Sequence, residues 1–380
     1  MMNVMSSSGI FKKRVFAFSF LCFFVQLLAF GQDQEETIKW IDIQDLQLEG
    51  RGWEKEADFF RRLPARAEGK VTPAVWRLSQ HTSGMYVRFK TDASSLKVKW
   101  SLTGENLAMP HFAATGVSGV DLYVKTEAGA WHWLSVGQPT KFPENETTFF
   151  TGVKAATREY MLYLPLYNGI ESLFIGIPEG ADLNPAFAEK KKPLVFYGTS
   201  ITQGGCASRA GMSTTAILGR KLDREMINLG FSGSGKMEPE MAHLLAELDP
   251  ELFFIDCLPN LTPEEVTERV APFIRILREK HPATPIILAE GINYDDAFFI
   301  ESRNQRNLES QKALRSAFEN LLNEGHRHLY YQIGEGQLGF DGEATVDGTH
   351  PTDLGFWRQA QVYQPLIERV LSTSRHRKVE

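Results

Sequence analysis

The sequence predicts two domains of different fold class. We expect a jelly-roll-like β-sandwich over residues 32–187 and an α/β domain with a doubly wound parallel sheet over residues 188–380. Apolar and polar residues alternate from about residue 75 to residue 177, which is typical of half-buried strands. Beyond residue 193, short continuous apolar runs alternate with helical stretches, as in parallel sheets that helices cover on both faces.

The N-terminal strands are recognised by their alternation. Residues 85–91 read MYVRFKT and residues 96–102 read LKVKWSL, with apolar side chains at every second position. Further strands of this kind are VDLYV, WHWLSV, REYMLYL and SLFIGI, and Gly, Asn, Pro and Thr turns separate them. Each strand is therefore expected to bury one face. The polar segment 178–192 predicts a linker to the second domain.

Five apolar runs predict the strands of the α/β domain: PLVFYG, MINLGF, LFFIDCL, PIILAE and HLYYQI. Helices are predicted between and after them, at about 213–223, 239–247, 262–280, 299–324 and beyond 351. The third helix has a clear start, because Thr262 is a suitable N-cap and Glu265 completes a capping box. In such a fold the functional site belongs at the carboxyl ends of the strands.

The first residues predict a secretory signal peptide. Basic residues 12–14 precede the apolar stretch 15–30, and Ala29-Phe30-Gly31 ends it with small residues at the two positions that a signal peptidase reads. About 16 apolar residues are too few for a membrane span. We therefore expect cleavage after Gly31 and a secreted or periplasmic protein that has no membrane association once the leader is removed.

Charge and cysteine content exclude several classes of function. The formal net charge is −6, and it becomes more negative without the basic leader. This balance argues against nucleic acid as a partner, because phosphates require a basic face. Two cysteines remain, Cys206 and Cys257; they are too few for a disulfide scaffold, and two half-buried thiols are favoured over a pair. No set of residues has metal-ligand spacing, so no metal or other cofactor is implied.

A glycine-rich segment, FYGTSITQGG at residues 196–205, follows the first strand of the α/β domain. It lacks the Gly-Lys-Ser/Thr ending of a phosphate-binding P-loop. The second glycine cluster, GFSGSG at 230–235, is the reverse of a dinucleotide fingerprint and follows the second strand. There is no G-x-S-x-G elbow either. What remains is Ser200, placed at a strand end where a nucleophile would be accessible.

A serine nucleophile needs a base, and the base needs a carboxylate that orients it. Asp347 and His350 stand three residues apart in VDGTHPTDLG, after the fifth strand and hence at the same sheet edge as Ser200. Donors for a developing oxyanion are predicted at two intervening strand ends, the backbone N–H of Gly233 and the side chain of Asn260. The N–H of Ser200 itself would be the third donor.

This ordered set resembles the SGNH, or GDSL-type, serine hydrolases. The resemblance covers about residues 190–375 and implies a flavodoxin-like domain in which Ser200 is the nucleophile, Gly233 and Asn260 are oxyanion donors, and Asp347 and His350 orient and accept the proton. Thr199 replaces the aspartate of the Gly-Asp-Ser motif, and residues 257–260 replace the usual Gly-x-Asn-Asp. The preceding β-sandwich resembles that of a bacterial two-domain subgroup.

A long loop, LTGENLAMPHFAATGVSG at residues 102–119, interrupts the strands of the first domain. Loops of this length in a compact domain are usually functional or disordered. The segment 107–111 is apolar, so we expect it to pack against the α/β domain. Our hypothesis is that Met109 and His111 reach the rim of the Ser200 pocket and bind substrate. The alternative is that the loop only joins the domains.

The sequence thus predicts a secreted serine esterase that acts on acyl esters, with acetyl esters of carbohydrates as the favoured class and a small-molecule or glycan ester as its substrate. The substrate class follows from the family resemblance and the leader alone. Two alternatives remain open: an acyltransferase that uses the same acyl-enzyme, and an inactive glycan-binding protein. The sequence does not indicate an oligomeric state.

Overall fold

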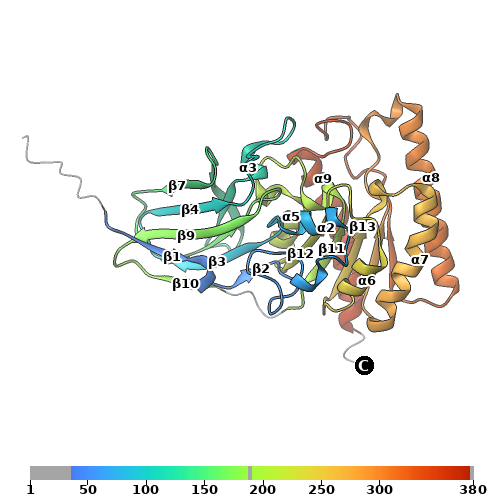
Figure 1. Cartoon of the computed structure of the whole chain (residues 1–380), viewed down its shortest axis with the longest axis horizontal. Coiled ribbons are helices and arrows are strands. Elements are labelled where there is room, and N and C mark those ends of the chain that lie inside the picture. Colours follow the sequence, from blue (N-terminus) through green and yellow to red (C-terminus); the bar gives the residue numbers. More distant parts are fainter. Residues whose placement is uncertain (1–35, 187–190, 377–380) are drawn as a thin grey trace, which may run out of the picture. The chain divides into compact units, whose positions relative to one another are not determined.

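The computed structural model describes residues 36–186 and 191–376 (Figure 1). Residues 39–380 form one compact unit, and this unit contains both regions that the sequence assigns to separate domains. The predicted leader, residues 1–31, lies outside the described residues. In the described part of the chain, no helix combines the length and the apolar character that crossing a membrane requires.

Two sheets make up the first region. One has the strand order β1-β9-β4-β7, formed by β1 (Ile38–Asp42), β9 (Ile170–Pro178), β4 (Leu96–Leu102) and β7 (Glu144–Phe150). The other has the order β10-β3-β8-β5-β6, with β2 also paired to β3; its strands are β10 (Leu183–Pro185), β3 (Tyr86–Thr91), β8 (Arg158–Tyr163), β5 (Val120–Lys125), β6 (Trp131–Gly137) and β2 (Leu48–Glu49). Pairing is antiparallel throughout the second sheet and between β4 and its two neighbours.

The two sheets share one hydrophobic core. Val98 and Trp100 of β4 are fully buried in it together with side chains of β3, β5 and β8, whereas Lys99 is exposed. The indole N–H of Trp100 donates to the carbonyl of Ser118 at 3.1 Å, so the ring is also held by a polar contact. The alternation predicted for residues 96–102 is confirmed.

The one-sided burial predicted for β3 is wrong over most of the strand, because both faces are buried from Tyr86 to Phe89 and Lys90 alone is exposed. Tyr86 and Arg88, on the face opposite Val87 and Phe89, are 5% and 4% exposed. Arg88 forms a two-point ion pair with Glu49 of β2, and Tyr86 belongs to a core that includes strands of the parallel sheet. A period-two pattern reports one apolar face but does not reveal that aromatic and paired charged residues cover the other.

Two other expectations from the first region need correction. Residues 73–79, expected at the start of the strands, form helix α2 (Pro73–Ser79), which Thr72 caps by accepting from the N–H of Val75. The predicted linker 178–192 contains a strand, β10, which pairs with β3 at the edge of the second sheet. Proline at the end of β10 suits an edge strand, which needs fewer ladder donors.

A five-stranded parallel sheet follows, and all five predicted strands are present. They are β11 (Leu194–Gly198), β12 (Met226–Gly230), β13 (Leu252–Asp256), β14 (Ile286–Ala289) and β15 (Leu329–Gln332). The order β12-β11-β13-β14-β15 is that of a flavodoxin-like doubly wound sheet. The register aligns the carboxyl ends of β11, β12 and β13, so Gly198 lies opposite both Gly230 and Asp256.

Helices cover both faces of this sheet. One face packs against α6 (Pro239–Leu245), α7 (Pro263–Lys280) and α8 (Glu301–Asn323), and the other against α5 (Thr214–Leu222) and α9 (Asp353–His376). The five helices predicted from the sequence are therefore confirmed. The capping box of α7 is also present: the Thr262 hydroxyl accepts from the N–H of Glu265, and the Glu265 carboxylate accepts from the N–H of Thr262.

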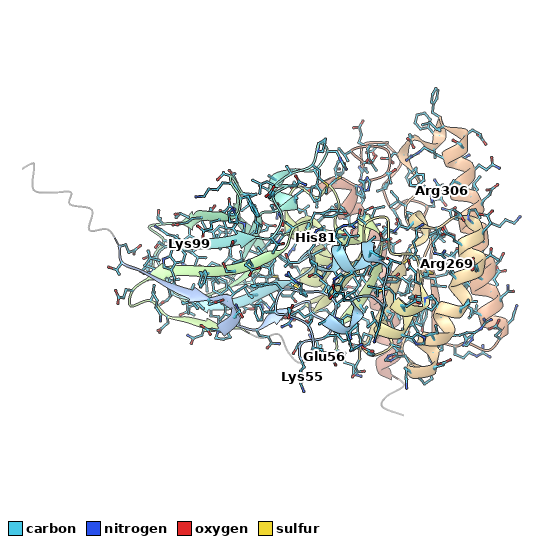
Figure 2. All side chains as sticks on the ribbon, in the orientation of Figure 1. Lys55, Glu56, His81, Lys99, Arg269 and Arg306 are labelled. Carbon is cyan, nitrogen blue, oxygen red and sulfur yellow. The ribbon has the colours of Figure 1, made fainter. Side chains whose placement is uncertain are left out.

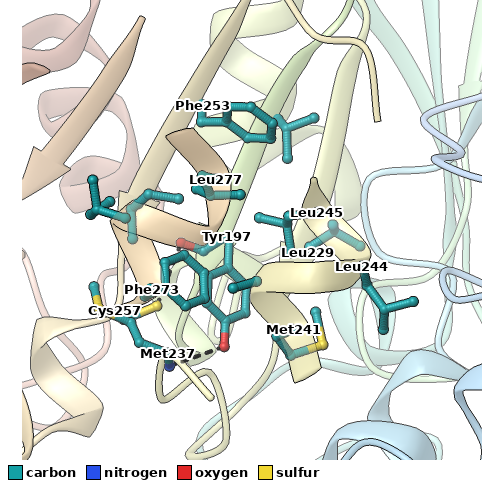
Figure 3. Packing of buried hydrophobic residues seen from close by; sticks show 14 of the residues in the cluster. Tyr197, Leu229, Met237, Met241, Leu244, Leu245, Phe253, Cys257, Phe273 and Leu277 are labelled. Carbon is teal, nitrogen blue, oxygen red and sulfur yellow. Dashed lines mark hydrogen bonds between the residues drawn. The ribbon is translucent and has the colours of Figure 1, made fainter. Parts of the chain in front are cut away.

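Tyr197 of β11 lies at the centre of the first of these cores. Its ring stacks on Phe273 of α7 with centroids 5.4 Å apart, and its hydroxyl accepts from the N–H of Met237 at 3.2 Å (Figure 3). Burial of the hydroxyl is therefore compensated by a hydrogen bond. The contact fixes the strand end at which the glycine-rich segment begins.

A buried arginine joins the first region to the edge of the parallel sheet. Arg62 is 1% exposed, and its guanidinium donates to four carbonyls, two of which belong to β12 and lie at Asn228 and Gly230. Burial lowers the pKa of Arg62 to about 9. Next to it, His81 is held by Gln203, whose Nε2 lies 3.2 Å from His81 Nδ1. These contacts connect residues 62–81 to the strand ends where the candidate site lies.

Candidate active site

Ser200 stands directly after β11 as the first residue of the short helix α4 (Ser200–Gln203). Thr199, which replaces the aspartate of the family motif, is the N-cap: its hydroxyl accepts from the N–H of Ile201, and the Thr202 hydroxyl accepts from the N–H of Thr199. The N–H groups of a first helical turn have no partner within the helix. Thr199 therefore holds the first turn of α4, and the Ser200 N–H at the start of this helix stays available to a ligand.

The structure brings the three predicted triad residues together. The Oγ of Ser200 lies 3.0 Å from Nε2 of His350, and Nδ1 of His350 lies 2.8 Å from Oδ2 of Asp347. Both distances are within hydrogen-bond range. The hydroxyl, the imidazole and the carboxylate thus form one continuous series of hydrogen-bond contacts, although Ser200 and His350 are 150 residues apart in the sequence.

The turn around Asp347 is built to hold this carboxylate. Its Oδ1 accepts from the backbone N–H groups of Thr349 at 3.0 Å and His350 at 2.7 Å, and Gly348 between them has φ +81°. Burial opposes ionisation of Asp347, but the hydrogen bonds from His350 and Thr349 outweigh it and lower the pKa of the carboxyl group. Asp347 is therefore kept ionised beside the imidazole.

The two predicted oxyanion residues lie at neighbouring strand ends. Gly233 (φ +65°) is at the tip of the turn 231–235, and a Cβ there would meet no atom within 4 Å. The Nδ2 of Asn260 lies 3.2 Å from the carbonyl oxygen of Gly235 in the same turn. The structure thus joins Asn260 to the turn of Gly233. That their N–H groups bind an oxyanion stays a prediction.

A residue that the sequence does not single out braces Asn260. Arg306 of α8 donates to the carbonyls of Pro259 at 3.0 Å and Leu261 at 3.1 Å, on either side of Asn260 (Figure 2). It also donates to the hydroxyl of Tyr294. An arginine on a long polar helix gives no sequence signal for this role, since the two carbonyls that it holds beside Asn260 are 45 residues away or more.

The loop 102–119 reaches the triad. The ring of His111 lies 5.8 Å from the ring of His350, which supports the rim position expected for it. The expected packing of segment 107–111 is found only at Leu107, and its partner is the core of the first region and not the α/β domain. Met109 is 39% exposed, and His111 is exposed as well. Phe112 is the anchor instead, 3% exposed and in edge contact with Tyr167. Hydrophobicity averaged over the segment did not distinguish the buried ring from its exposed neighbours.

Cys206 lies close to both histidines. His111, Cys206 and His350 each have one possible metal-ligand atom, and these three atoms lie within 4.8 Å of one another. Burial, together with the charge of Asp347, raises the pKa of the Cys206 thiol to about 12. Cys206 and Cys257 are both free thiols, as the sequence favours, although Cys257 is fully buried and not half-buried. The sequence shows no metal-ligand spacing for this set, because its members come from three distant segments.

Comparison with known proteins identifies the family. Residues 191–368 match the GDSL-like lipase/acylhydrolase family, and residues 38–183 match the N-terminal domain of SGNH-hydrolase-type esterases. A protein described as a GDSL-like lipase from Bacteroides ovatus is 35% identical, with a TM-score of 0.85 over 88% of this chain and 98% of that one. The chain belongs to the GDSL-like lipase/acylhydrolase family. It is an ester hydrolase of the SGNH type.

More distant structures share the fold of this GDSL-like hydrolase. A salicylyl-acyltransferase from a tetracycline biosynthetic pathway has a TM-score of 0.72 and 18% identity, covering 88% of this chain and 97% of that one. A family two carbohydrate esterase from Clostridium thermocellum, in complex with cellohexaose, has a TM-score of 0.55 and 14% identity, covering 76% and 93%. No curated protein matches the sequence.

A buried carboxyl group lies beneath the site of this GDSL-like hydrolase. Asp256 ends β13 next to Gly198 and is 3% exposed; the Tyr363 hydroxyl lies 3.2 Å from its Oδ2, and its Oδ1 has no hydrogen-bond partner in the described part of the chain. Burial raises the pKa of Asp256 to about 7, against the effect of the hydrogen bond from Tyr363. The sequence does not single out Asp256, which lies within the apolar run LFFIDCL.

We predict that Asp256 makes stability depend on pH. The native state keeps the proton up to about pH 7, whereas the unfolded chain loses it near pH 4. The stabilisation from this proton is therefore complete below about pH 4 and is lost as the pH rises to about 7. Between about pH 4 and pH 7, the free energy of unfolding should fall less in Asp256→Asn than in wild type. The difference should be a few kcal/mol, because a shift of one pKa unit corresponds to about 1.4 kcal/mol.

Urea denaturation at several pH values measures this difference. Asp249→Asn is the control, because the Asp249 side chain is 75% exposed. Identical pH slopes for wild type and Asp256→Asn would show that the carboxyl group is ionised in the native state.

Proposed function

We propose that Ser200, His350 and Asp347 are the nucleophile, base and orienting carboxylate of a serine esterase that hydrolyses acyl esters, specifically acetyl esters of carbohydrates. The observation that carries the proposal is the continuous chain of contacts Ser200 Oγ–His350 Nε2–His350 Nδ1–Asp347 Oδ2, with distances of 3.0 and 2.8 Å. Such a chain activates a hydroxyl that is otherwise a weak nucleophile.

The geometry suits a two-step acyl transfer. Ser200 Oγ attacks the ester carbonyl while its proton passes to Nε2 of His350, and Asp347 stabilises the imidazolium. The imidazolium then protonates the leaving alcohol, and the acyl group remains on Ser200. A water molecule, deprotonated by the same Nε2, attacks the acyl-enzyme and releases the carboxylic acid. The proton returns to Ser200, so the enzyme is restored.

The charge that develops on the carbonyl oxygen needs donors fixed in advance. The Ser200 N–H at the start of α4, the Gly233 N–H and the Asn260 amide are the proposed donors. Their positions are supported by the contact of Asn260 with the turn of Gly233 and by the brace from Arg306. The positive end of a helix as short as α4 adds little to these direct hydrogen bonds.

Water access favours hydrolysis over transfer to another acceptor. The side chain of His350 is 25% exposed and that of Asp347 is 38% exposed. Solvent therefore reaches the base that would activate water. The likeness to an acyltransferase, at 18% identity, concerns the fold alone.

A carbohydrate substrate is supported by a groove beside the triad loop. Asp295 donates its N–H to the carbonyl of Gly348, so the short helix η5 (Asp295–Phe298) lies against the turn of Asp347. The adjoining groove has a volume of about 460 Å³ and is lined by carboxamides, carboxylates and two exposed rings, Phe298 and Phe340. Amides bind sugar hydroxyls and aromatic faces pack against the apolar face of a sugar ring. The fold shared with a cellohexaose-bound esterase is consistent with such a substrate.

We also propose that the N-terminal region is a jelly roll. Apart from the short strands β2 and β10, eight strands form the orders β1-β9-β4-β7 and β3-β8-β5-β6. Eight strands in two sheets around one core are what a double-sheet jelly roll requires. A crystal structure tests this, and a different strand order would contradict it.

We predict that the triad acts as a unit. Ser200→Ala and His350→Ala should each lower kcat by several orders of magnitude, and the double variant should be hardly worse than either, because both residues serve one step. Hydrolysis of p-nitrophenyl acetate and labelling by a fluorophosphonate probe measure this. Thermal melting is the control for folding. Losses that multiply in the double variant would show that the two residues do not share a step.

We predict that the groove binds the sugar part of the substrate. Phe340→Ala and Phe298→Ala should raise KM for an acetylated oligosaccharide about three- to tenfold, the amount one aromatic contact contributes. KM for p-nitrophenyl acetate should not change, since this ester is too small to reach the groove. Phe299→Ala is the matched control, because Phe299 is 84% exposed next to Phe298 but does not line the groove. Equal effects on both esters would contradict a sugar site.

We predict, from the leader pattern, that the chain is exported and cleaved. N-terminal sequencing of protein purified from its natural source should give Gln32 as the first residue. A mature chain that retains residues 12–30 would contradict this proposal.

A further inference from the structure

Three side chains with metal-binding atoms converge at the catalytic histidine. His111 comes from the loop before β5, Cys206 from the turn after α4, and His350 from the loop before α9. One ligand atom of each lies within 4.8 Å of those of the other two. Nothing in the proposed ester chemistry requires Cys206 or a thiol at this place.

The backbone around Cys206 is arranged to present the thiol there. Cys206 has φ +77°, a left-handed conformation that is uncommon outside glycine. The turn is closed by the N–H of Gly205 to the carbonyl of Ser200 at 2.8 Å and by the N–H of Ala207 to that of Gly204. The turn that carries Cys206 is therefore hydrogen-bonded to Ser200, the residue whose hydroxyl contacts His350.

The loop that carries His111 is fixed to the same turn. Met109 and Phe112 exchange two backbone hydrogen bonds around His111, and Phe112 is buried. The hydroxyl of Thr115 donates to the carbonyl of Ser208, two residues after Cys206. The imidazole is exposed, so its side-chain rotamer can change while its backbone stays in place.

Two imidazoles and one thiol are a ligand set for a soft divalent ion. Zn²⁺ is bound by histidine at about 2.0–2.1 Å and by cysteine at about 2.3 Å, so ligands on a tetrahedral ion lie about 3.3–3.7 Å apart. The present separations are at most 4.8 Å, so they exceed these values by no more than about 1.5 Å, and side-chain rotations of His111 and Cys206 can close the difference. Oxygen-preferring ions such as Mg²⁺ and Ca²⁺ do not favour this set.

The second shell of such a site is already present. A histidine that binds zinc almost always donates its other ring N–H to a carboxylate or carbonyl. His350 does so through Nδ1 to Asp347, which leaves the lone pair of Nε2 for the metal. This is the same lone pair that would accept the proton of Ser200.

We propose that His111, Cys206 and His350 form an inhibitory Zn²⁺ site in which the metal occupies Nε2 of His350. The thiol of Cys206 releases its proton to solvent as the Zn–S bond forms, and water completes the tetrahedron. With Nε2 on the metal, no base remains for Ser200, so the enzyme is reversibly switched off. Metal binding stands on the geometry alone, whereas the inhibition rests on the proposed role of His350.

Binding is tested first, in the Ser200→Ala variant, where no turnover interferes. Calorimetric titration with ZnCl₂ should show one site, and Cys206→Ser or His111→Ala added to this background should raise Kd at least about tenfold, as removal of a ligand requires. Co²⁺ should give a thiolate-to-metal charge-transfer band that Cys206→Ser abolishes. His132→Ala is the matched control, because His132 is an exposed histidine on β6.

Inhibition is tested in the active enzyme. Zn²⁺ should abolish esterase activity and EDTA should restore it, while Cys206→Ser should keep its basal activity and need at least about tenfold more Zn²⁺. Equal Kd values in the parent and the ligand variants would overturn the site. Tight binding that leaves activity unchanged would overturn the inhibition. An enzyme inactive on every ester that still binds Zn²⁺ through Cys206 would contradict the proposed function and leave the site standing.

Discussion

The site depends on one close backbone contact, the passage of the turn after β12 over the end of β11. The N–H of Phe231 donates to the carbonyl of Gly198 at 3.0 Å, and a Cβ on Gly235 would lie only 1.9 Å from that oxygen. Gly230 is equally restricted, because its Cβ would meet the N of Gln203 at 2.1 Å. Only glycine permits two backbone segments to approach each other this closely. The contact sets the turn of Gly233 beside α4, whose first residue is Ser200.

The turn that carries Asp347 and His350 depends on a different support, the start of α8. Arg303 donates to the carbonyl of Gly348 and the hydroxyl of Thr349, within the turn that connects Asp347 to His350. Arg306, one turn later on the same helix, holds the backbone on either side of Asn260. Two arginines three residues apart on one helix thus position both the proposed base and a proposed oxyanion donor. Charged donors to carbonyls are strong hydrogen bonds, which suits groups that must not move.

The N-terminal region contributes to the site as well as to stability. Asp121 of β5 is fully buried and accepts hydrogen bonds from Arg209 and from the N–H of Gly211, three and five residues after Cys206. Burial raises the pKa of Asp121, and the charge of Arg209 opposes this. On the other side, Arg62 bonds to the end of β12. The antiparallel sheets therefore hold the loop of His111 and the segment after α4 in register with the triad.

The sequence by itself determined the periodic features of this protein. Its five buried strands, the helices between them and the capping box at Thr262 follow from local patterns, because backbone geometry and burial impose a period on the side chains. Ser200, Asp347 and His350 were found because loops after parallel strands meet at one sheet edge, so chain order implied proximity. Only the tertiary structure decided which faces and side chains the neighbouring elements cover. The buried second face of β3, the orphan oxygen of Asp256, the arginine brace at Asn260 and the meeting of His111 with Cys206 depend on contacts between distant segments, and such contacts leave no period in the sequence.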